Sequence, residues 1–70
     1  MIKEVKLFRC EYNTDPDDED LAKAIEIAKE NHCFVKIEWT MKWSGSYSLV
    51  ADEDDTIEDL KRHIPKIYGM

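Results

Sequence analysis

The chain has little of what defines several common classes of protein. No apolar segment approaches the roughly 18 residues of a transmembrane helix, and the first residues contain no uninterrupted apolar core of a signal peptide. We therefore expect a cytoplasmic protein that does not bind membranes. Because Gly45 and Gly69 are the only glycines, the chain also lacks a glycine-rich loop of the kind that holds phosphate groups.

Cysteine is equally scarce. Cys10 and Cys33 are too few for a disulfide framework, and neither belongs to a CxxC motif. His32 and His63 complete a Cys2His2 set by residue count, but the four residues are not paired at the usual spacing of zinc ligands. We expect two buried free thiols, no metal site and no cofactor.

The size and composition predict a single domain over residues 1–70 that is not an enzyme. The 70 residues are 43% hydrophobic and 37% charged, which is typical of a globular chain. A domain of this size buries only about 60% of the surface that its unfolded chain exposes, so little chain remains to enclose a pocket. A metal-dependent or thiol enzyme would require bound metal or a reactive Cys33.

Hydrophobic spacing predicts a strand and then a helix in the first half of the chain. Residues 3–12 are rich in Val, Leu, Phe and Tyr, as in a strand. Asp15 as the cap and Pro16 as the first helical residue predict a helix that reaches Asn31. Its apolar residues recur at steps of three and four: Leu21, Ala24, Ile25 and Ala28.

The second half begins with a predicted hairpin. Apolar and polar residues alternate strictly over residues 33–43, which predicts one long strand with a buried face. Residues 44–46 form the expected turn, and residues 47–51 return as a third strand. The apolar match predicts the pairs Trp43–Tyr47, Met41–Leu49 and Trp39–Ala51.

A capping box predicts a second, shorter helix. Either Asp55 with Glu58 or Thr56 with Asp59 supplies the box, and Pro65 ends the helix. The element order is β-α-β-β-α, and a right-handed crossover makes the first two strands parallel. The predicted fold is α+β: a two-layer sandwich in which a three-stranded mixed sheet carries two helices on one face.

Part of this pattern resembles a known family. Phe34-Val35-Lys36, the hairpin and the segment Asp55–Lys61 resemble the opening hairpin and helix of ubiquitin-like β-grasp domains. The resemblance covers about half of the chain. Only residues 65–70 follow, so the later β-grasp strands are missing, and a strand and a helix precede the hairpin instead. The resemblance implies no function.

Acidic residues outnumber basic ones, and most of the excess lies in two clusters. The net charge is −6, from 16 Asp and Glu against 10 Lys and Arg. This balance argues against direct nucleic-acid binding, which needs a basic surface, and predicts a protein partner with a basic surface, such as a nucleic-acid-binding enzyme. The first acidic cluster is Asp15, Asp17, Asp18, Glu19 and Asp20, and the second acidic cluster is Asp52, Glu53, Asp54 and Asp55.

The leading hypothesis is therefore a non-catalytic protein-binding domain. It would be a small acidic inhibitor of the phage or mobile-element type, anti-CRISPR-like, in which carboxylates mimic a nucleic-acid backbone. The competing interpretation is that each cluster serves only its helix start and solubility. The alternative function is a homo-oligomerising or edge-pairing module, a homodimer for example. Its contact residues on the outer sheet face would be Val5, Leu7, Phe34 and Val50.

Overall fold

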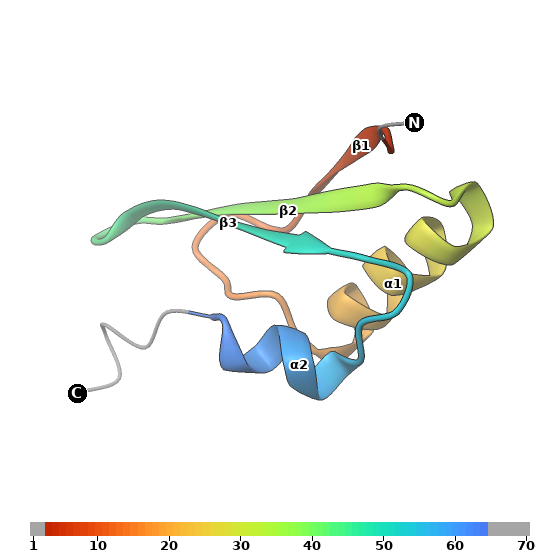
Figure 1. Cartoon of the computed structure of the whole chain (residues 1–70). Coiled ribbons are helices and arrows are strands. Elements are labelled where there is room, and N and C mark those ends of the chain that lie inside the picture. Colours follow the sequence, from red (N-terminus) through yellow and green to blue (C-terminus); the bar gives the residue numbers. More distant parts are fainter. Residues whose placement is uncertain (1–2, 65–70) are drawn as a thin grey trace.

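The computed structural model describes residues 3–64 and has the predicted order of elements (Figure 1). The strands are β1 (Val5–Arg9), β2 (Phe34–Met41) and β3 (Gly45–Ala51), and the helices are α1 (Asp18–Asn31) and α2 (Ile57–Arg62). The central strand β2 pairs with β1 in parallel and with β3 antiparallel. Both helices lie on one side of the sheet in Figure 1, so the predicted α+β sandwich is confirmed. No helix within residues 3–64 is long and apolar enough to cross a membrane.

Helix α1 begins two residues later than predicted. Asp17, not Asp15, is the N-cap, and its Oδ1 accepts the Asp20 N–H at 2.9 Å while Asp20 Oδ2 accepts the Asp17 N–H at 3.2 Å. This reciprocal pair satisfies two N–H groups that a helix start leaves unbonded. The helix ends at Asn31 as predicted, and His32 follows in a left-handed conformation with φ 48°.

The core lies between the helices and the inner face of the sheet. Leu21, Ala24 and Ala28 of α1 are fully buried, and Leu60 of α2 is 1% exposed. The sheet contributes Val35, Ile37, Trp39, Leu49 and Ala51. Cys33 is buried as predicted, whereas Cys10, one residue past the end of β1, is only half-buried.

The hairpin has a different register from the predicted one. Strand β2 ends at Met41, which pairs with Gly45. Tyr47 pairs with Trp39 and not with its predicted partner Trp43, which lies four residues further along the chain. Residues 42–44 form the turn, and Gly45 follows with φ 99°, a conformation that glycine adopts without strain. An even shift keeps the same faces together, so alternation alone does not separate the two registers. The predicted strand over residues 33–43 places Trp43 on the buried face with Trp39, and this was wrong, because the Trp43 side chain is 88% exposed.

The two ends of the fold contain further differences. Strand β1 is shorter than predicted, although the Cys10 N–H still bonds to the Glu38 carbonyl. Of the two predicted capping boxes of α2, the Thr56–Asp59 box forms, and its hydrogen bond from Thr56 lowers the pKa of Asp59. The predicted stop at Pro65 lies outside the described residues.

We expect Leu21→Ala to lower the free energy of unfolding by about 2–5 kcal/mol, because it leaves a cavity between α1 and the sheet. The total free energy of unfolding of a domain of this length is only about 3–10 kcal/mol. Urea unfolding followed by circular dichroism measures the change. Leu7→Ala is the matched control: Leu7 is 53% exposed, so a change within about 0.5 kcal/mol is expected. Equal losses in the two variants would contradict this description of the core.

Candidate functional site

The first acidic cluster surrounds the start of α1. Asp17 and Asp20 form the capping box, and Asp18 Oδ1 lies 3.1 Å from Lys61 Nζ at the end of α2. Asp18 and Glu19 are exposed. Carboxylates are favourable here because the N-terminal end of a helix carries partial positive charge. Most of this cluster therefore stabilises the helix, while its charge still faces solvent.

Asp15, the remaining member, has a different role. Its Oδ1 accepts the indole N–H of Trp39 at 2.9 Å. Trp39 is 3% exposed and stacks on Tyr47 with ring centroids 5.8 Å apart. A buried indole N–H needs an acceptor, so this carboxylate is committed to the core and is only partly exposed. Sequence reasoning assigned Asp15 to a cap because nothing in the local pattern connects it to Trp39.

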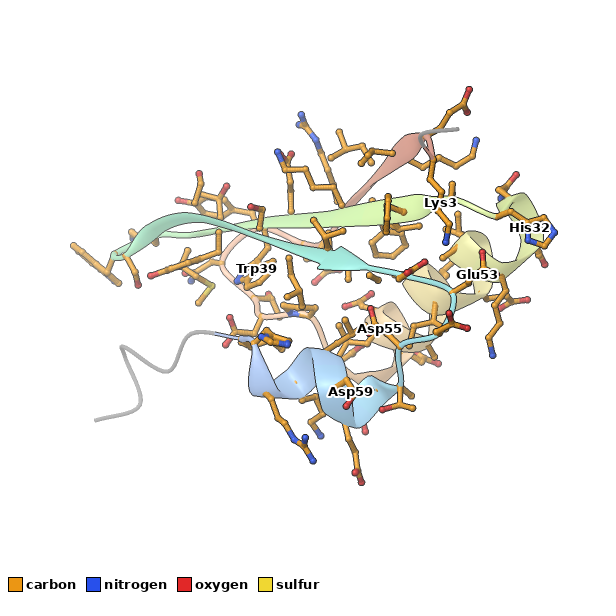
Figure 2. The ribbon with its side chains drawn as sticks, viewed as in Figure 1. Lys3, His32, Trp39, Glu53, Asp55 and Asp59 are labelled. Carbon is orange, nitrogen blue, oxygen red and sulfur yellow. The ribbon has the colours of Figure 1, made fainter. Side chains whose placement is uncertain are left out.

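The second acidic cluster lies between β3 and α2, beside the N-terminal segment (Figure 2). Lys3 Nζ lies 2.8 Å from Asp52 Oδ1 and 3.4 Å from Glu53 Oε2. The hydrogen bond to Asp52 raises the pKa of Lys3, and the same bond lowers the pKa of Asp52. Asp55 Oδ2 accepts the Asp52 N–H at 2.7 Å, so the cluster also closes its own turn.

The two clusters lie in one layer of the fold but at opposite ends of it. Asp18 of the first cluster lies at the start of α1, where it contacts Lys61. Glu53 of the second cluster lies near the other end of α1, 3.6 Å from His32. The 14 residues of α1 span about 20 Å at 1.5 Å per residue. A partner that contacts both clusters must therefore cover the length of this helix.

Charge is divided between the two layers of the fold. The helices and the segments leading into them, residues 15–31 and 52–62, hold thirteen acidic and four basic residues, a net −9. The strands and their connections, residues 3–14 and 32–51, hold three acidic and five basic residues, a net +2. We call the first set the acidic helical layer. The division follows from the charges of these segments together with the placement of both helices on one face of the sheet, which the sequence predicts and the structure confirms.

The four apolar residues predicted on the outer sheet face do converge. Val5 lies opposite Phe34, and Leu7 and Val50 lie on either side of Lys36. Val5, Leu7 and Val50 are 59%, 53% and 53% exposed, while Phe34 is half-buried under Lys3, whose Nζ lies 5.1 Å from the ring centroid. These four residues form an outer patch, and Lys36 interrupts it at the centre.

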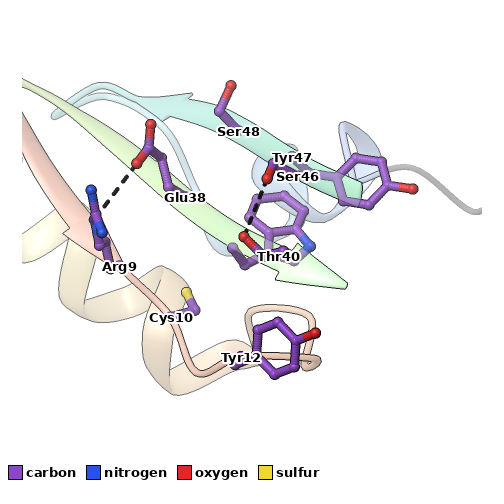
Figure 3. Close-up of a pocket in the computed structure, with 9 residues that line it drawn as sticks. Arg9, Cys10, Tyr12, Glu38, Thr40, Ser46, Tyr47 and Ser48 are labelled. Atoms are coloured by element: carbon purple, nitrogen blue, oxygen red, sulfur yellow. Dashed lines mark hydrogen bonds and ion pairs between the residues drawn. The ribbon is translucent and has the colours of Figure 1, made fainter. Parts of the chain in front are cut away.

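A hollow of about 490 Å³ beside the outer patch was missed by the sequence analysis (Figure 3). Arg9 and Glu38 lie opposite each other in the sheet and approach to 3.8 Å, and the hydroxyls of Thr40 and Ser46 lie 3.3 Å apart. The only available signal was the polar residue at every second position near the hairpin turn, at Glu38, Thr40, Ser46 and Ser48. The hollow is open, its lining mixes polar with aromatic side chains, and it reaches Ser46 and Ser48 of β3.

Both thiols are at least partly buried. Burial, with smaller contributions from Asp20 and Asp17, raises the pKa of Cys10 to about 11, and a thiol nucleophile must be deprotonated. Cys33 is 2% exposed. Within residues 3–64, no three His, Cys, Asp or Glu side chains are placed to hold a metal ion.

No protein-family model matches the chain, and no curated protein or solved structure matches it either. The resemblance of the hairpin and second helix to β-grasp domains therefore stays a resemblance of sequence.

We expect Lys3→Met to flatten the dependence of stability on pH in the acid range. Because Lys3 lowers the pKa of Asp52, the unfolded chain binds more protons between that lowered value and about 3.9. The stabilisation is thus present above that window and is lost as the pH falls through the pKa of the folded state. Unfolding free energies measured from pH 2 to 6 test this, with Lys42→Met at the exposed turn as the control. An unchanged acid slope in Lys3→Met would contradict the role given to this pair.

Proposed function

We propose that this chain is a non-catalytic protein-binding domain that binds a basic protein through its acidic helical layer. The observation that supports the proposal is the division of charge, −9 in the helical layer against +2 in the sheet layer. A dipolar distribution of this kind orients an approaching basic surface toward the helices and raises the association rate. It also disfavours the sheet face as the contact for such a partner.

The geometry of the carboxylates supports a surface that is ordered before binding. Asp17, Asp20 and Asp55 each accept a backbone N–H of the chain itself, and Asp15 and Asp52 accept side-chain donors. Groups held in this way lose little conformational freedom when a partner binds. The exposed members Asp18, Glu19 and Asp54 add charge without a capping role.

The narrower proposal is an inhibitor of a nucleic-acid-handling enzyme. Fixed carboxylates over a helix about 20 Å long present negative charge to a surface that normally neutralises phosphates. This is the mode of action expected of a small acidic phage or mobile-element inhibitor of the anti-CRISPR-like kind, acting in the cytoplasm. The basic partner is then the enzyme itself, and the chain binds no nucleic acid.

The outer patch supports a second candidate function, homo-oligomerisation. Val5, Leu7, Phe34 and Val50 come from all three strands and form one apolar surface. Lys36 at its centre is unfavourable for packing two such faces together, because a two-fold axis there would bring like charges close. The outer patch is therefore the weaker of the two candidates.

We expect the triple variant Asp18→Asn, Glu19→Gln and Asp54→Asn to weaken binding to a basic partner about tenfold or more. The variant spares both capping boxes, so the fold is retained. Binding is measured against proteins captured from a nuclease-treated lysate, over a range of salt concentrations. Affinity should fall steeply with salt, since screening shortens the range of these charges to about 8 Å at 0.15 M.

A matched control separates the effect of charge in the acidic helical layer from the effect of net charge alone. Glu4→Gln, Glu11→Gln and Glu38→Gln remove the three acidic residues of the sheet layer and change the net charge by the same amount. This control should bind like the unaltered chain. Equal loss in both triple variants, or binding that does not respond to salt, would refute the acidic helical layer as the contact surface.

A further inference from the structure

The free edge of β3 has no charged side chain. From Trp43 to Ala51 the chain runs for nine uncharged residues, although 37% of the whole chain is charged. Edge strands are normally protected from pairing by lysines, prolines or bulges. The other edge of the sheet, β1, does carry such charges, Lys6 and Arg9.

The hydrogen bonds identify which backbone groups of β3 point away from the sheet. Phe34, Glu38 and Thr40 of β2 bond to the segment containing β1, so even-numbered residues of β2 face β1 and odd-numbered residues face β3. The odd-numbered residues of β3 pair with these, as in Ile37–Leu49. The outward N–H and C=O groups of β3 therefore belong to Ser46, Ser48 and Val50, and within residues 3–64 no strand pairs with this side.

The free edge has a defined end. The next outward N–H belongs to Asp52, and Asp55 Oδ2 accepts it at 2.7 Å. Past this point the chain turns into the second acidic cluster, while at the other end of β3 the hairpin turn carries Lys42. The edge is thus an uncharged segment with one basic end and one acidic end.

We propose that β3 pairs antiparallel with β3 of a second copy of the chain, around a two-fold axis at Ser48. Ser48 then lies opposite Ser48 of the second copy, and Ser46 lies opposite its Val50, with about six backbone hydrogen bonds between the copies. The two sheets join into one of six strands.

Charge complementarity indicates a second copy as the occupant. Antiparallel pairing places the hairpin turn of each copy, with Lys42, beside residues 52–54 of the other, where Asp54 is exposed and Lys3 already contacts Asp52 and Glu53. No like charges meet along the strands themselves, because β3 is uncharged. The same geometry places both acidic helical layers on one side of the joined sheet. The backbone pairing runs along β3, outside those layers, and only residues 52–54 of the acidic helical layer adjoin it, so the pairing does not depend on the proposed basic partner.

Light scattering and sedimentation at 0.15 M salt test the pairing, because this ionic strength screens the net charge of −6 on each copy. We expect a dimer with a Kd on the order of 10 µM, typical of a small interface. Ser48→Pro removes an outward N–H without breaking a bond to β2, and it should weaken the dimer at least tenfold. Leu7→Pro is the matched control, since Leu7 has the equivalent outward position on β1, and it should leave the dimer intact.

Charged substitutions of Ser48 test the register of the pairing between the two copies. Ser48→Lys and Ser48→Glu place like charges opposite each other, so each variant alone should be monomeric, whereas a mixture of the two should form a heterodimer. Circular dichroism and cooperative urea unfolding confirm that the variants are folded. A monomeric unaltered chain at about 1 mM, or a dimer lost in Leu7→Pro and kept in Ser48→Pro, would overturn the proposal. Failure of the mixture to associate would overturn the register.

Discussion

The burial of Trp39 is the constraint on which most of this small fold depends. The indole ring stacks on Tyr47, and its N–H needs an acceptor, which Asp15 supplies from the segment before α1. One side chain thereby joins the central strand, the hairpin and the entry to the first helix. The capping box that begins the helix follows two residues later, at Asp17.

The same layering explains where the charge lies. Two short helices need acidic residues at their starts, since the helix dipole and the unbonded N–H groups favour carboxylates there. With both helices on one face of the sheet, these residues accumulate in one layer, and the strands keep a small excess of basic residues. Stabilising the helices and presenting a negative surface to a partner are therefore compatible, because a carboxylate that accepts a backbone N–H remains charged.

The sheet shows a corresponding asymmetry between its edges. Strand β1 carries Lys6 and Arg9, whereas β3 is uncharged and leaves the backbone groups of Ser46, Ser48 and Val50 facing outward. A three-stranded sheet has too few strands to cover its edges with its own chain, so the composition of each edge decides what it pairs with. In this protein β3 is the edge without charged residues, and it lies next to a turn that exposes Trp43.

Local and periodic signals in the sequence determined the five elements, their order and the apolar faces of α1 and β2, because spacing of 3.6 and 2 residues reports directly on burial. They also identified both acidic clusters and all four residues of the outer patch. Only the tertiary structure decided the hairpin register, since the two registers differ by an even number of residues and bury the same faces. It also decided the position of Trp43 outside the core, the bond from Trp39 to Asp15 and the separation of the clusters, because these depend on contacts between residues that are distant in the chain.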